Sequence, residues 1–192
     1  MSPVSPKLPI MSLGDPPESR QAALRAMAHP VRLRMLSLLT GASLTAADIA
    51  RELGLTHANA SYHLRNLLAA GLIVQAAEER IRGGVAKRYR YDAERSRDRD
   101  RETMLGEHGA DSQRALFAVV ANELIRRTAA ADWSVGGSMT DAELWVDPDA
   151  WRAIRDRITE LSRDLHAAAR PPHTPGTIRT STTIAMFRMA ES

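Results

Sequence analysis

The chain has 192 residues and no cysteine, and its 26 lysine and arginine residues against 23 aspartate and glutamate residues give a formal net charge of +3. That length suits one large domain or two small ones. The absence of cysteine excludes disulfides, thiolate metal sites and cysteine nucleophiles. No run of about 18 apolar residues exists, so no membrane span is predicted. The N-terminus has no apolar signal-peptide core, and the cytoplasm is the expected compartment.

The N-terminal part is predicted to be an arm followed by two helices. Residues 1–17 contain five prolines and no helical periodicity, and we expect them to be disordered. From Glu18 the pattern is helical, with a break at His29 because Pro30 suits the first position of a new helix. Gly41 is expected to end that second helix.

A pair of short helices is predicted next. Thr45 and Asp48 have the spacing of a capping box, and Gly54 provides a left-handed stop for the helix that they begin. Thr56 is a second N-cap, two residues later. Two short helices joined by a glycine-containing turn are typical of a helix-turn-helix motif. The second helix, His57 to Ala70, is expected to bury Ala60, Leu64, Leu67 and Leu68.

A β-hairpin is predicted after Gly71, where the periodicity changes. Residues 72–74 and 87–91 are strand candidates, and Arg82-Gly83-Gly84 is the expected hairpin tip. This hairpin would be the wing of a winged helix. Charges alternate over residues 92–102, which indicates a solvated connector, and a longer helix is predicted from about residue 111 to 131.

The last third contains all three tryptophans. We expect a short strand at 142–146, then an amphipathic helix that begins at Asp147-Pro148, and a central strand at 178–189. The aromatic residues either line an effector pocket or form the core of a small C-terminal domain, and the core is the simpler interpretation. The residues concerned are Trp133, Trp145, Trp151, Met186 and Phe187.

Positive charge is concentrated between His57 and Tyr91. Six basic residues against two glutamates give this segment a net charge of +4, so the rest of the chain sums to −1. Such clusters are often only a solvated surface, but here they follow a helix-turn-helix spacing. The DNA major groove admits one helix and the flanking phosphates attract basic side chains, so the spacing favours DNA binding.

The outward face of the predicted second helix carries small or hydrogen-bonding side chains near its N-terminus, where base contacts are usually made. The base-reading candidates are Thr56, His57, Ala58, Ser61, Tyr62 and Arg65. The candidates for backbone contacts from the wing are Arg80, Arg82, Lys87, Arg88 and Arg90.

Residues 28–36 (AHPVRLRML), 45–55 (TAADIARELGL), 61–67 (SYHLRNL) and 70–73 (AGLI) carry a family resemblance. As a set they resemble the winged-helix domain of ArsR-type bacterial transcription regulators, over roughly residues 21–91. The resemblance implies a homodimer on a pseudo-palindromic operator, which usually represses transcription until a signal loosens binding.

Metal sensing is not expected. Metal sensors of that family use a cysteine-containing box or paired histidines and carboxylates after the wing, whereas this chain offers only His108 near Glu107 there. A metal site needs three or four convergent ligands, and His166 with His173 would also be a poor site. His29 is expected to make a structural hydrogen bond and His63 to be packed. We predict no metal and no cofactor.

The predicted fold class is α+β. A mainly helical winged helix-turn-helix domain would occupy residues 18–93, a connector and dimerisation helix residues 94–131, and a small α/β region residues 132–192. No nucleophile elbow, phosphate-binding loop or zinc-protease motif is present, so no catalysis is expected.

The expected function is sequence-specific binding of double-stranded DNA by a homodimer, with a small-molecule effector as the expected signal. Its recognition helices would lie about 34 Å apart. One alternative is a winged-helix protein-interaction module without sequence-specific DNA binding. Another is a small-molecule-binding domain whose DNA-binding half is vestigial.

Overall fold

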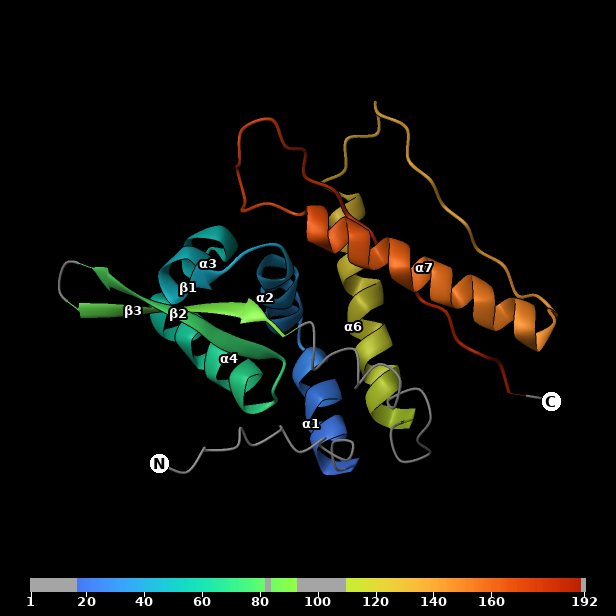
Figure 1. The fold of residues 1–192 in the computed structure, drawn as a ribbon, viewed down its shortest axis with the longest axis horizontal. Helices are drawn as coiled ribbons and strands as arrows, with labels where there is room; N and C mark the ends of the chain where they lie inside the picture. Colours follow the sequence, from blue (N-terminus) through green and yellow to red (C-terminus); the bar gives the residue numbers. More distant parts are fainter. Residues whose placement is uncertain (1–16, 82–83, 93–109, 191–192) are drawn as a thin grey trace, which may run out of the picture.

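The computed structural model describes residues 17–81, 84–92 and 110–190 (Figure 1). Most of the predicted N-terminal arm, the hairpin-tip residues 82–83 and the charged connector lie outside these residues. The elements in chain order are α1 (Pro17–Met27), α2 (Pro30–Gly41), β1 (Leu44–Thr45), α3 (Ala46–Leu53), α4 (His57–Ala69), β2 (Ile73–Ile81), β3 (Gly84–Tyr91), α6 (Ala110–Thr128) and α7 (Pro148–Ala168). Helices and a small antiparallel sheet confirm the α+β class.

The predicted break between the first two helices is confirmed, and side chains fix it. His29 is the N-cap of α2, and its Nδ1 accepts a hydrogen bond from the Val31 N–H at 3.2 Å. Arg32 reaches back to the end of α1, where its guanidinium donates to the carbonyl of Arg25 at 3.0 Å. Both contacts satisfy backbone groups that a helix end leaves without intrahelical partners.

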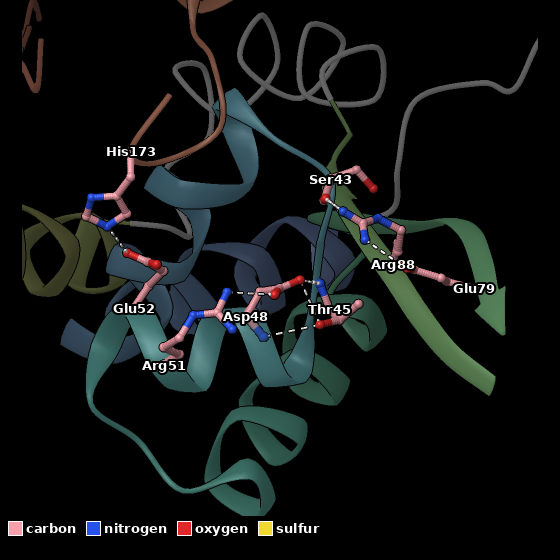
Figure 2. Close-up of polar contacts among 8 residues, drawn as sticks. All are labelled: Ser43, Thr45, Asp48, Arg51, Glu52, Glu79, Arg88 and His173. Carbon is pink, nitrogen blue, oxygen red and sulfur yellow. Dashed lines mark hydrogen bonds and ion pairs between the residues drawn. The ribbon is translucent and has the colours of Figure 1, made fainter. Parts of the chain in front are cut away.

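The capping box predicted at the start of α3 is present (Figure 2). The Thr45 hydroxyl accepts from the Asp48 N–H at 3.1 Å, and the Asp48 carboxylate accepts from the Thr45 N–H at 3.0 Å. Arg51 donates to the same carboxylate at 2.9 Å. This reciprocal pairing fixes where α3 begins and therefore where the helix-turn-helix turn lies.

The sheet has the strand order β1-β3-β2, with both pairs antiparallel. The wing is longer than the sequence predicts, because β2 runs to Ile81 and its register pairs Ile81 with Gly84. The two-residue strand β1, which the sequence analysis missed, pairs Leu44 with Tyr89. This pairing attaches the wing to the segment between α2 and α3.

The apolar core belongs to the helix-turn-helix region alone. In the described part of the chain, every buried apolar residue lies between residues 23 and 73. The most completely buried side chains come from α2, α3, α4 and the start of β2: Met35, Leu39, Ile49, Leu64, Leu67 and Ile73.

The two C-terminal helices were predicted correctly. Asp147 caps α7, since its carboxylate accepts from the N–H groups of Asp149 and Ala150 at 2.9 and 3.0 Å. α6 packs beside α1, and the end of α7 approaches α2 so closely that a Cβ on Gly41 would lie 3.0 Å from the Cβ of Ala169. None of the described helices has the length and apolar character of a membrane span.

The prediction of two C-terminal strands is wrong. Residues 142–146 and 178–189 have no strand pairing, so within this chain the region is one helix with extended segments rather than α/β. The tryptophans form no core either, because Trp133 and Trp145 are 72% and 99% exposed and α7 buries no residue. Both segments have the β-propensity that led to the prediction, but a strand also needs a neighbouring strand with which to pair.

Candidate nucleic-acid interface

The turn between α3 and α4 is held by its backbone. Gly54 has φ +64°, the left-handed conformation that glycine adopts without strain, and the Leu55 N–H donates to the Ala50 carbonyl at 2.8 Å. Thr56 then begins α4, with its hydroxyl accepting from the Asn59 N–H at 3.2 Å. These contacts set the direction in which α4 leaves the turn.

α4 has one buried face and one open face. Ala60, His63, Leu64 and Leu67 are buried in the core. The predicted burial of Leu68 is wrong, since this side chain is 41% exposed at the edge of the apolar stripe. The predicted base-reading residues all lie away from the core; Ser61 is half-buried, and the others, Thr56, His57, Ala58, Tyr62 and Arg65, are exposed.

Asn59 is not among the base-reading residues predicted from the sequence. Its side chain is exposed on the first turn of α4, beside the predicted set, and only its backbone N–H is used by the Thr56 cap. An amide can donate and accept at once, which is the chemistry that reads adenine in the major groove. The sequence signal that could have identified Asn59 is its position three residues after the N-cap Thr56.

The inner face of α4 contacts the start of α2 through two histidines. The rings of His29 and His63 have centroids 4.8 Å apart, and the Nδ1 atom of His63 is buried without a hydrogen-bond partner in the described residues. Burial lowers the pKa of His29, and the nearby Arg32 and Arg34 lower it further. Burial, then His29 and Arg32, likewise lower the pKa of His63. Both predicted structural roles are confirmed.

The wing presents basic side chains on both faces. Arg80, Lys87 and Arg90 are exposed, and Arg82 lies outside the described residues. Opposite residues on paired strands share a face, so the register that pairs Lys87 with Glu78 puts Arg80 on the face of Lys87. By the same alternation Arg90 lies on the other face.

Arg88 differs from the other wing residues because its guanidinium is engaged within the chain. It donates to the Glu79 carboxylate at 2.6 Å and to the Ser43 carbonyl at 2.9 Å (Figure 2). These contacts join the two wing strands to the segment before β1. Arg88 therefore holds the wing in place.

The cavity found in the structure is not the predicted aromatic one. It has a volume of about 300 Å³ and lies among α2, α6, α7 and the C-terminal segment. None of the predicted pocket residues lines it: Trp151 and Met186 are half-buried elsewhere, and the Phe187 ring is tilted against the Phe117 ring, with their centroids 5.6 Å apart. Its lining residues are Leu33, Val120, Glu123, Arg127, Ser162, His166, Thr182, Thr183 and Ile184.

The C-terminal loop also contacts the helix-turn-helix directly. The Nε2 atom of His173 lies 3.1 Å from the carboxylate of Glu52 on α3 (Figure 2). His166 lines the cavity instead of approaching His173. In the described part of the chain, no three histidine, aspartate or glutamate residues gather as metal ligands would.

Comparison with known families agrees with this geometry. Residues 27–76, from the end of α1 into β2, match the family model of a helix-turn-helix domain. These residues therefore form a helix-turn-helix domain, similar to that of ArsR-type regulators. The resemblance seen in the sequence is thereby confirmed for these residues, and a helix-turn-helix domain is a type of domain that binds DNA.

Parts of this chain are also similar to solved structures. A possible transcriptional regulatory protein from Mycobacterium bovis (fragment 1–100) is 26% identical, with 49% of this chain and 92% of that chain covered and a TM-score of 0.35. A possible transcriptional regulator for arsenical resistance is 24% identical, with 58% and 97% covered and a TM-score of 0.32. A DNA-bound mutant of S. aureus MepR is 16% identical, with 77% and 90% covered and a TM-score of 0.28. No curated protein matches the chain.

Proposed function

We propose that this regulator binds a pseudo-palindromic operator as a homodimer and represses transcription. In this proposal residues 18–93 bind DNA, residues 94–131 connect and dimerise, and residues 132–192 complete the dimer. The supporting observation is the division of α4 into a core face and an open polar face. Such a helix can enter the major groove without disturbing the core that holds it.

The open face of α4 supplies the proposed base contacts. Arg65 can donate two hydrogen bonds to a guanine edge, and Asn59 can pair with adenine. Tyr62 offers a hydroxyl and an apolar ring to a thymine methyl group. The smaller side chains allow close approach and add single hydrogen bonds: Thr56, His57, Ala58 and Ser61.

The wing supplies the proposed phosphate contacts. Arg80 and Lys87 are exposed on one face of the wing, and Arg90 lies on the other face. Because the Arg88 guanidinium already binds Glu79 and Ser43, its main role in this proposal is to position the wing. A phosphate contact from Arg88 is secondary to that role. Arg82 remains a candidate from its sequence position at the hairpin tip.

Arg65→Ala tests the base contact, measured by fluorescence anisotropy on the DNA upstream of the protein's own gene and on a random duplex. A bidentate contact predicts a loss of about 1–3 kcal/mol on the specific site and much less on random DNA. Arg155→Ala is the matched control, because it removes an exposed arginine from α7, which should leave both affinities unchanged.

Three outcomes would count against the proposal. Equal losses on both duplexes would make Arg65 a phosphate contact. Similar affinity of the unmodified protein for all DNA would contradict sequence specificity. Failure to bind DNA at low salt would favour the alternative, in which the exposed face of α4 is a protein-interaction surface.

A small-molecule effector has a specific candidate site in the cavity of about 300 Å³. Its lining combines apolar side chains with hydroxyl, imidazole, guanidinium and carboxylate groups, a mixture that suits a small polar organic molecule. Leu33 brings α2 into the lining, so an occupant would contact the DNA-binding domain directly.

Ser162→Trp, which fills this cavity, tests the effector site. We expect some members of a panel of small organic acids and amines to raise the melting temperature and to change operator affinity. The substituted protein should show neither response to them. A response that survives the substitution would place the effector elsewhere.

A further inference from the structure

The C-terminal region exposes far more apolar surface than the rest of the chain. Among the described residues, 19 large apolar side chains are exposed, and 13 of them lie between residues 133 and 189. Leu144 and Trp145 are adjacent in the segment between α6 and α7, and they are 73% and 99% exposed. A concentration of exposed apolar side chains of this kind indicates a covering partner.

The charges of this region identify the kind of partner. Residues 133–190 contain seven acidic and seven basic residues, so their net charge is zero. The first segment, residues 141–147, carries three carboxylates and no basic residue, whereas the second segment, residues 178–189, carries two arginines and no carboxylate. One segment is thus the electrostatic complement of the other, and a second copy supplies both.

The backbone leads to the same partner. Residues 142–146 and 178–189 have strand-like composition but no strand neighbour in the described chain, and Figure 1 shows residues 131–147 as an open thread between α6 and α7. In a two-fold dimer, a contact of segment i with segment j of the other copy occurs twice. Two such pairs would give each of the two segments in each copy a neighbouring strand.

We propose that residues 141–147 of one copy pair with residues 178–189 of a second copy, and reciprocally, so that the C-terminal sheet forms only in the dimer. This inference rests on the proposed dimeric function and names the segments that build the dimer.

The surface available is large enough for a stable dimer. A specific interface buries about 800 Å² from each partner, and a tryptophan contributes about 150–250 Å² of that. Trp133 and Trp145 alone would supply about half. On α6, the predicted dimerisation helix, Phe117, Leu124 and Ile125 are exposed as well, and Phe117 lies against Phe187 of the second segment.

Trp145→Glu tests the proposal, because a side chain that is 99% exposed in the single chain has no packing to lose there. Val85→Glu, on the half-exposed outer part of the wing, is the control. We expect sedimentation to show a dimer for the unmodified protein and for the control. Trp145→Glu should weaken the dimer about 30-fold or more, as loss of an interface anchor does.

Two further measurements locate the contact. All three tryptophans lie in this region, so their emission should report buried indoles in the dimer and water-exposed indoles in Trp145→Glu. Amide hydrogen exchange should be slow over residues 142–146 and 178–189 in the dimer and fast in the monomer.

Several results would overturn the proposal. The unmodified protein could be monomeric, or it could form a dimer in which both segments exchange fast. The Trp145→Glu variant could be as dimeric as the control, or slow exchange could persist in the monomer. The last result would mean that the chain pairs its own two segments.

Operator binding by the same samples separates this inference from the proposed function. A dimer with unprotected segments that binds its operator refutes this inference alone, and a protected dimer that binds no DNA refutes the proposed function alone.

Discussion

The carboxylate of Glu123 on α6 lies 3.7 Å from the guanidinium of Arg34 on α2. Glu123 is buried and also contacts Arg126 at 2.8 Å and Arg127 at 4.0 Å. This contact joins the DNA-binding domain to the helix expected to dimerise, beside the cavity. Together with the packing of α6 beside α1 and the contact of His173 with Glu52, this carboxylate holds the two halves against each other.

Glu123→Gln keeps the shape of the side chain and removes its charge. Since its arginine partners are partly exposed, we expect a loss of about 1–3 kcal/mol in the free energy of unfolding, measured by urea denaturation. Asp111→Asn is the control, because its pair with Arg114 on the same helix is exposed and should contribute almost nothing. Equal effects of the two substitutions would contradict a joining role for Glu123.

The histidine pair predicts a loss of stability in mild acid. Because the pKa of His29 and that of His63 are lowered below the ordinary 6.5, the unfolded chain binds more protons than the folded chain as the pH falls below 6.5. The free energy of unfolding should therefore be highest above pH 6.5 and decrease below it. His29→Asn keeps a good N-cap, and combined with His63→Gln it should flatten this dependence. An unchanged slope in the double variant would contradict the assignment.

Thr45→Ala tests the capping box. The substitution removes the hydroxyl that accepts from the Asp48 N–H and donates to its carboxylate at 2.8 Å, and should lower the free energy of unfolding by about 1–2 kcal/mol. Thr128→Ala, at the exposed end of α6, is expected to change stability by a few tenths of a kcal/mol at most. If the two substitutions had the same effect, the cap would contribute nothing to α3.

Substitutions of two groups of wing residues are expected to have different effects. Replacing Arg80 and Lys87 together by alanine should weaken binding to all DNA and reduce the slope of log affinity against log salt by about 2, one unit for each lost phosphate contact. Arg88→Ala should instead lower the melting temperature, because Glu79 and Ser43 lose their partner. A steep salt slope retained without Arg80 and Lys87 would refute the proposed wing contacts.

The helices could be predicted because their signals are local. The caps His29, Thr45, Thr56 and Asp147 act within three residues, so the sequence alone locates the starts of α2, α3, α4 and α7. Leu68 was misassigned because it lies at the edge of the apolar stripe, where burial depends on the neighbouring elements.

The strands depended on contacts distant in sequence. β1 has only two residues and exists because β3, more than forty residues later, pairs with it. The engagement of Arg88 by Ser43 was unpredictable for the same reason. The strands predicted at 142–146 and 178–189 are absent, because composition alone does not reveal whether a neighbouring strand is available for pairing.

The position of α4 in DNA can be measured most directly by affinity cleavage. The chain has no cysteine, so Ser61→Cys creates a unique attachment point on the open face of α4 for an iron–EDTA reagent. We predict two cleavage sites on the operator, in successive major grooves about 34 Å apart. The same reagent attached through Arg155→Cys on α7 should leave those grooves uncut. Diffuse cleavage from Ser61→Cys, or cleavage no stronger than from α7, would contradict the insertion of α4 into the groove.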